Sequence, residues 1–192
     1  MNIKEIKNYV KNTYNVNCLL DRFGANTKLK KSSGGKYSVA GLSLMPSLKF
    51  CPMSIKAGCF DLCLKSAGRG RFNNVVNARN NKSNFYNNDY ELFMILLKHE
   101  LELHVMNCKK NNVNPSARLN VLSDIPYEKT DIFNTFKEIY FYDYTKRANR
   151  IEACNSIENY KLMFSYSGRD AYLNQVSKAL NFSNPIAVVF RK

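Results

Sequence analysis

The second half of the chain alternates apolar, β-rich runs with segments of helical spacing, and this rhythm constrains the fold more than any other feature. The runs cover residues 117–123, 139–145, 160–167 and 186–190, with polar segments of helical spacing between them. Parallel strands need a long crossover connection, which a short helix supplies. With a first run at 37–44, the rhythm predicts an α/β fold in which five parallel strands with right-handed βα crossovers form a partial or small TIM-like barrel.

Three further helices are predicted before this region, over residues 2–14, 72–86 and 89–110, with Asp89 as the N-cap of the last. We expect the glutamates of this last helix, including Glu100, to face solvent. Its apolar residues recur on one face, which we expect to lie against the sheet: Phe93, Leu96, Leu97, Leu101, Val105 and Cys108.

A chain of 192 residues suits one domain. We expect residues 1–36 to form a helical arm and a basic linker, and residues 37–192 to form the α/β core with a cysteine loop at 51–70. The chain has no run of 18 apolar residues and no apolar leader, which predicts a cytoplasmic protein without a membrane span. In a reducing compartment, its six cysteines are expected to be thiols.

The charge of the chain predicts a polyanionic partner. It has 29 Lys and Arg against 15 Asp and Glu, a net charge of +14 that is spread along the sequence. Such a field attracts nucleic acid at long range. The alternative is that the charge serves solubility in a composition biased toward Lys and Asn.

Three of the six cysteines, Cys51, Cys59 and Cys63, fall in one short loop, separated by seven and then three residues. Three thiolates without an evident fourth ligand suit a 4Fe-4S cluster with one iron open, or zinc (Zn) completed by a distant residue or water. The alternative is three unrelated buried cysteines. The two histidines in HELELH, His99 and His104, are five residues apart and cannot share a metal as an i, i+4 pair would, so we interpret them as ordinary helix-face residues.

Polar residues follow the predicted strands, at the carboxyl edge where parallel α/β folds bind ligands. Asp124 and Asp143 can hold a divalent metal for phosphodiester cleavage; alternatively, Asp143 pairs with Arg147. The candidates at this edge are, for catalysis, Asp124, Asp143 and Lys146 and, for cofactor binding, Ser123 and Ser167.

Two basic stretches are predicted to bind anions. GRGRF at 68–72 can seat a phosphate before a helix, with a tight turn of solvated arginines as the alternative. In FYDYTKR at 141–147, a tyrosine can stack on a base, and we expect one of Tyr142 and Tyr144 to face the core. The candidates are Arg69 beside the cofactor and, for nucleic acid or another anion, Arg71, Tyr144, Arg147 and Arg169.

The three-cysteine loop after a first strand is distantly similar to that of radical S-adenosylmethionine enzymes. In those enzymes the cysteines are separated by three and then two residues, whereas the intervals here are seven and three. The similarity implies an iron-sulfur cluster more strongly than it implies S-adenosylmethionine.

Several motifs together resemble the phage gene product 88 family: the cysteine loop ending in GRG at 68–70, ARLNVLSDIPYE at 117–128, FYDYTKR at 141–147 and YKLMFSYSG at 160–168. The resemblance implies an origin in a phage or mobile element, in the cytoplasm of the infected or carrying cell. It implies no reaction. It does imply a shared site at Cys51, Cys59, Cys63, Arg69, Asp124, Asp143 and Lys146.

Two functions therefore stay open. The first is a phage or mobile-element protein that binds an iron-sulfur cluster through the cysteine loop and presents a basic face to nucleic acid or a nucleotide-like anion. The second is a non-catalytic, zinc-stabilised viral protein that binds nucleic acid or modulates the host. If the chain is an enzyme, we expect a radical-SAM-like enzyme or a metal-dependent nuclease.

Overall fold

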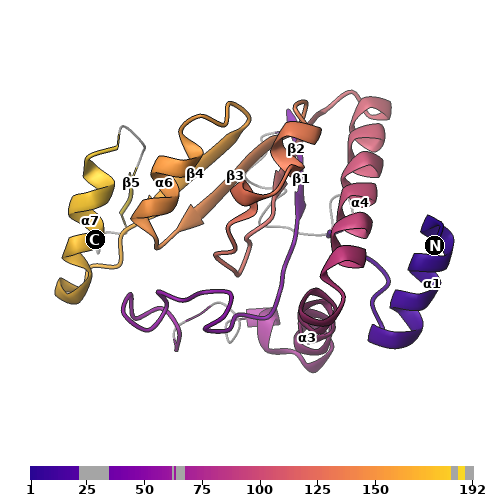
Figure 1. Cartoon of the computed structure of the whole chain (residues 1–192), viewed down its shortest axis with the longest axis horizontal. Coiled ribbons are helices and arrows are strands. Elements are labelled where there is room, and N and C mark those ends of the chain that lie inside the picture. Colours follow the sequence, from indigo (N-terminus) through magenta and orange to yellow (C-terminus); the bar gives the residue numbers. More distant parts are fainter. Residues whose placement is uncertain (22–34, 62, 64–67, 183–185, 189–192) are drawn as a thin grey trace.

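A parallel sheet forms the centre of the molecule. We describe a computed structural model over residues 1–21, 35–61, 63, 68–182 and 186–188. The strands pair side by side in the order of the sequence (Figure 1): β1 (Tyr37–Gly41), β2 (Asn114–Arg118), β3 (Tyr140–Thr145), β4 (Tyr160–Ser165) and β5 (Ile186–Ala187). The predicted parallel α/β fold is confirmed. A TIM-like barrel is not confirmed, because β1 and β5 do not pair with each other among the described residues.

Helices connect the strands, as the rhythm of the sequence predicts. Those before β2 gather at the β1 end of the sheet, and α6 and α7 lie beside β4 and β5 (Figure 1). The helices are α1 (Ile3–Tyr14), α3 (Asn73–Asn88), α4 (Tyr90–Lys110), α5 (Ile132–Thr135), α6 (Ala148–Cys154) and α7 (Leu173–Leu180), with short 3-10 turns η2 (Gly68–Arg71), η3 (Tyr127–Lys129) and η4 (Asp170–Tyr172).

The second strand lies earlier than predicted, at Asn114–Arg118 instead of 117–123. The side chain of Asn120 accounts for the difference. Its Oδ1 accepts hydrogen bonds from the hydroxyl of Ser123 and the N–H of Ile125, both at 2.8 Å. These bonds close a turn, and strand pairing ends before it. The second part of the predicted strand 117–123 therefore forms the loop that follows β2.

The two faces of the sheet differ in burial. On β3, Phe141, Asp143 and Thr145 are buried, whereas Tyr142 and Tyr144 are half-buried on the opposite face. The expectation that one of these tyrosines faces the core is wrong, because residues two apart in a strand point to the same side. One face is thus covered by the core, and the other, which we call the open face, is only partly covered.

The long helix α4 packs against β2 with the predicted apolar stripe buried. His104 joins this stripe: its Nε2 lies 3.2 Å from the carbonyl oxygen of Ser38 and 3.0 Å from that of Ser116. The prediction that Glu100 faces solvent is wrong. Its carboxylate accepts hydrogen bonds from the N–H groups of Leu19 and Leu20 at 2.8–3.0 Å and so ties the backbone that precedes β1 to α4.

The helix α1 packs on α3 and α4. Asn2 caps it in a capping box with Glu5, and Ile6 and Val10 belong to the main core. Asp89 makes no side-chain capping bond to α4, although its position predicts one. Its Oδ2 instead accepts the hydroxyl hydrogens of Tyr9 at 2.8 Å and Tyr14 at 2.7 Å, which links α1 to the junction of α3 and α4.

The predicted basic linker lies mostly outside the described residues. In the part of the chain that the structure describes, no helix is long and apolar enough to cross a bilayer.

Candidate functional site

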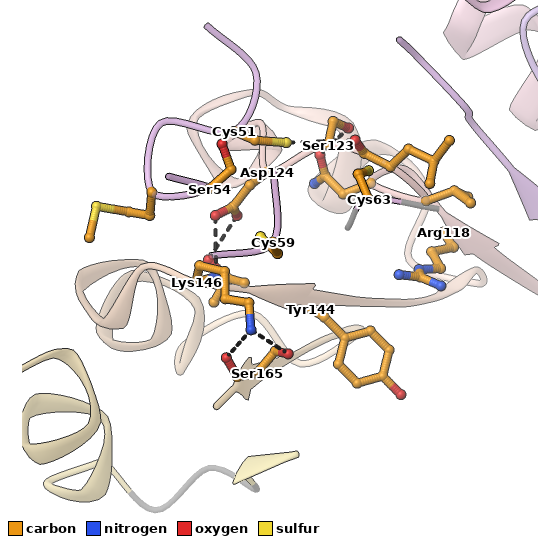
Figure 2. A pocket seen from close by; sticks show the side chains of 15 residues that line it. Cys51, Ser54, Cys59, Cys63, Arg118, Ser123, Asp124, Tyr144, Lys146 and Ser165 are labelled. Carbon is orange, nitrogen blue, oxygen red and sulfur yellow. Dashed lines mark hydrogen bonds between the residues drawn. The ribbon is translucent and has the colours of Figure 1, made fainter. Parts of the chain in front are cut away.

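The three loop cysteines line one pocket at the carboxyl edge of the sheet. Cys51, Cys59 and Cys63 share its wall with residues that follow β2 and β3 and with Ser165 at the end of β4. The pocket measures about 290 Å³, and Figure 2 shows the three side chains around it. No disulfide joins any of the six cysteines. We call this hollow the thiol pocket.

Hydrogen bonds fix the start of the cysteine loop to the segment after β2. The Cys51 thiol donates to the carbonyl oxygen of Leu122 at 3.6 Å, and the N–H of Asp124 donates to that of Phe50 at 2.8 Å. Burial, followed by the charge of Asp124 and of the neighbouring thiols, raises the pKa of Cys51 to about 12. Burial also raises the pKa of Cys59, although the charge of Lys146 opposes it. Both groups are therefore neutral thiols near pH 7, and a metal that binds them must displace their protons.

Gly58 allows a second segment to approach the loop. Its φ is +68°, in the left-handed region that favours glycine. A Cβ at this position would meet the guanidinium of Arg169, which follows β4. The predicted anion-binding residue Arg169 thus lies against the cysteine loop, with its side chain outside the wall of the thiol pocket.

We expect Gly58→Ala to lower the free energy of unfolding by about 1–2 kcal/mol from backbone strain alone, and further because Arg169 must move. Gly168→Ala is the matched control, since Gly168 has φ +71° but no atom within 4 Å of an added Cβ. Urea unfolding of both variants measures the difference. Equal losses would contradict a packing role for Arg169.

Lys146 brings a cation to the pocket wall. Its Nζ donates to the carbonyl oxygen of Ser165 at 2.7 Å and to the hydroxyl oxygen at 3.1 Å, so it is held between β3 and β4 (Figure 2). Burial lowers the pKa of Lys146, while Cys59 and Asp124 act in the opposite direction. The ammonium group faces the same hollow as the thiols and can balance negative charge there.

A buried arginine holds Asp124 in the pocket wall. Asp124 Oδ1 accepts hydrogen bonds from Thr145 Oγ1 at 2.7 Å and from Arg150 Nη1. The guanidinium of Arg150 also forms a two-pronged pair with Glu128, at 2.8 and 2.7 Å. The side chains of Arg150 and Glu128 are only 2% and 3% exposed. One side of the pocket is therefore built on a buried cluster of three charged groups.

Asp143 lies behind the thiol pocket and does not line it. It is 1% exposed and accepts a hydrogen bond from the N–H of Asn120 at 3.0 Å. Its ion pair is with Arg118 Nε at 3.4 Å, so the alternative pairing with Arg147 is wrong. Burial raises the pKa of Asp143 to about 7, although Arg118 and Asn120 lower it. Each of the two candidate carboxylates thus already has an arginine partner.

A family model described as gene product 88 matches residues 18–192, which is most of the chain. The chain belongs to the gene product 88 family. No curated protein and no solved structure matches it. Similarity to radical S-adenosylmethionine enzymes is not among these matches. Family membership assigns no activity, so the site of this member must be interpreted from its own geometry.

The structure divides the remaining site candidates of this gene product 88 member into two groups. Ser123 and Tyr144 line the thiol pocket. Four others lie outside its wall: Arg69 and Arg71 are exposed in η2, Arg147 precedes α6, and the buried hydroxyl of Ser167 has no hydrogen-bond partner in the part of the chain that the structure describes.

Sequence reasoning missed four residues of the site: Arg118 and Asn120, which line the pocket, and Glu128 and Arg150, which support its wall. The first two and Glu128 lie in the motif ARLNVLSDIPYE at 117–128. The signal that could have found them is that they are polar residues within a motif that carries the family resemblance. Arg150 had no such signal, because it lies in an ordinary amphipathic segment.

No group of three or more His, Cys, Asp or Glu side chains is arranged to hold a metal ion in the described ranges. The three thiols line one hollow without converging on a single point. The thiol pocket therefore provides three sulfur ligands around its volume, with the ammonium group of Lys146 and the carboxylate of Asp124 in the same wall.

Proposed function

We propose that this gene product 88 protein binds an iron-sulfur cluster in the thiol pocket, with Cys51, Cys59 and Cys63 as ligands. The observation that carries the proposal is that three thiols of one loop line one pocket at the carboxyl edge of a parallel sheet. Cysteine thiolates are the usual ligands of such clusters, and three of them leave one iron of a 4Fe-4S cluster open to a further ligand.

The arrangement of the thiols supports a cluster over a single ion. Zinc binds sulfur at about 2.3 Å, so the ligands of one ion must converge on a point. Each thiolate of a cluster binds a different iron, so its ligands stand around a volume instead. The thiols here line a pocket of about 290 Å³ and form no preorganised group for one ion among the described residues.

The surroundings suit an anionic cofactor. Thiolates and sulfides give a cluster negative charge, and the Lys146 ammonium at the pocket wall offsets it. Asp124 adds negative charge, but its carboxylate is paired with Arg150. The same pairing argues against a nuclease that uses Asp124 and Asp143 to share a divalent metal, since Arg118 neutralises the other carboxylate. The hypothesis that S-adenosylmethionine binds the open iron is supported only by the number of cysteines in the loop.

Metal content after anaerobic purification tests the proposal. We expect a brown protein with about four irons and four sulfides per chain, the content of one 4Fe-4S cluster. The triple variant Cys51→Ser, Cys59→Ser, Cys63→Ser should be colourless and free of iron. Cys18→Ser is the matched control, because Cys18 is also half-buried but lies outside the pocket, and it should keep the full content.

Two other outcomes would contradict the cluster. A colourless wild-type protein with one zinc per chain would support the alternative, a non-catalytic protein stabilised by zinc. Wild-type protein that holds no metal and matches the unfolding free energy of the triple variant would leave the thiols as buried side chains without a ligand.

A further inference from the structure

The open face of the sheet carries a second hollow, which shares the Tyr144 side chain with the thiol pocket. It measures about 450 Å³. Strand alternation brings every second residue of four strands to this face, and half of the residues that line the hollow are tyrosines. Its most prominent residues are Tyr37, Tyr140, Tyr142, Tyr144, Lys161 and Met163.

Two of the four tyrosines on this face are exposed, although both faces of a parallel sheet are usually covered. Tyr37 is 43% exposed and Tyr140 is 46% exposed. Their rings lie side by side, with centroids 6.5 Å apart. Arg118 lies over the ring of Tyr144 at 5.1 Å, so this ring already accepts a planar cationic group on one face.

The charged residues that β1 to β4 place on the open face are cations. Register pairs Tyr142 with Lys161 on the neighbouring strand, and Lys161 is exposed. The guanidinium of Arg118 lies on the same side of β2, where it is also paired with Asp143. In β1 to β4, the residues that alternation places on this face include no Asp or Glu. A polyanion with flat apolar groups complements a surface of exposed tyrosines and cations.

We propose that the open face binds single-stranded nucleic acid, with Tyr37, Tyr140 and Tyr142 as stacking surfaces for bases and Lys161 as a phosphate contact. Unpaired bases stack on aromatic side chains without regard to sequence, and a sheet that presents rings and cations is one of the surfaces that bind them. A duplex keeps its bases stacked on one another and cannot use the rings.

A second copy of the chain is the other partner that an apolar face could attract. The charge argues against it, because each copy carries +14 and two such copies repel each other. The same charge draws a nucleic acid to the surface. The proposal does not depend on a cluster in the thiol pocket, and its test uses the full chain as purified.

Fluorescence anisotropy with fluorescein-labelled oligo(dT) and oligo(rU) of about twelve nucleotides tests the proposal. We expect Tyr140→Leu and Tyr142→Leu each to weaken binding by about 5- to 150-fold, the range for losing one base–aromatic stack. Tyr90→Leu is the matched control: Tyr90 is 42% exposed on α4, away from the open face, and its loss should leave the affinity unchanged. Circular dichroism confirms that each variant is folded.

A salt titration separates the phosphate contact from general charge. Lys161→Gln should make the slope of log K against log salt shallower by about 0.7, the value for one contact with a single strand. Lys109→Gln removes the same charge from the end of α4 and should leave the slope as it is.

Three outcomes would overturn the proposal. The first is a wild-type protein that binds neither oligonucleotide. The second is equal weakening by Tyr90→Leu and the open-face variants, which would make the effect non-specific. The third is a dimer in sedimentation that Tyr140→Leu dissociates while no oligonucleotide binds, which would assign the face to a second copy.

Discussion

Replacing Arg150 by Met should lower the free energy of unfolding by about 3–5 kcal/mol, the cost of removing one partner from a buried ion pair. Arg150 is the cation between Asp124 and Glu128, and all three side chains are less than one-tenth exposed. Methionine fills similar space but leaves two carboxylates without a counter-charge. For a chain of this size the melting temperature should fall by roughly 6–20 °C, which calorimetry measures.

Arg147→Met is the matched control for this substitution. The substitution is the same, three residues earlier in the chain, but the side chain of Arg147 is half-buried and forms no ion pair among the described residues. Arg147→Met should therefore lower the free energy of unfolding only slightly. A deficit of Arg150→Met that is small at pH 7, or one that Arg147→Met matches, would contradict the role given to Arg150.

Replacing Asp143 by Asn should make the protein more stable at pH 8, by about 2–4 kcal/mol. Burial raises the pKa of this carboxyl to about 7, above the value of about 4 expected in an unfolded chain. The native state therefore holds the proton more tightly than the unfolded state. The stability that this group contributes is fully present below about pH 4 and is lost as the pH rises through 7. Asparagine keeps the shape and an oxygen for the N–H of Asn120 without the charge.

Urea unfolding of both proteins from pH 4 to pH 8 measures this effect. The two curves should coincide near pH 4 and diverge toward pH 8, with the variant higher. Asp131→Asn is the control: the hydrogen bond from Lys98 lowers the pKa of this largely exposed carboxyl, so its removal should be slightly unfavourable at neutral pH. Parallel curves for wild type and Asp143→Asn would contradict a raised pKa at this site.

The fold could be predicted where one periodicity governs a whole element. The apolar stripe of α4 and the β-rich runs of β3 and β4 each follow one repeat, and each element lies where predicted. Prediction failed where a side chain replaced a backbone partner. Asn120 closes a turn inside an apolar run, and Glu100 caps backbone N–H groups from a segment that is eighty residues away in the sequence. Periodicity carries no information about such bonds.

The candidate site could be predicted as far as topology determines it. The carboxyl ends of parallel strands meet at one edge, and the structure accordingly brings Ser123, Asp124 and Lys146 to the cysteine loop. Arg69 and Arg71 show the limit, because sequence proximity to the loop says nothing about where a side chain points. Asp143 pairs with Arg118 at the end of the neighbouring strand, because the ends of adjacent strands lie close together whatever their distance in the sequence.

The helix α1 shows that the evolutionary boundary of this chain is not its folding boundary. The family match begins at residue 18, after α1 has ended at Tyr14. Yet Ile6 and Val10 are at most 2% exposed within the main core, and two tyrosine hydroxyls of α1 satisfy the carboxylate of Asp89. A protein shortened to its family segment would lack α1, and the apolar residues of α3 and α4 that α1 covers would be exposed to solvent.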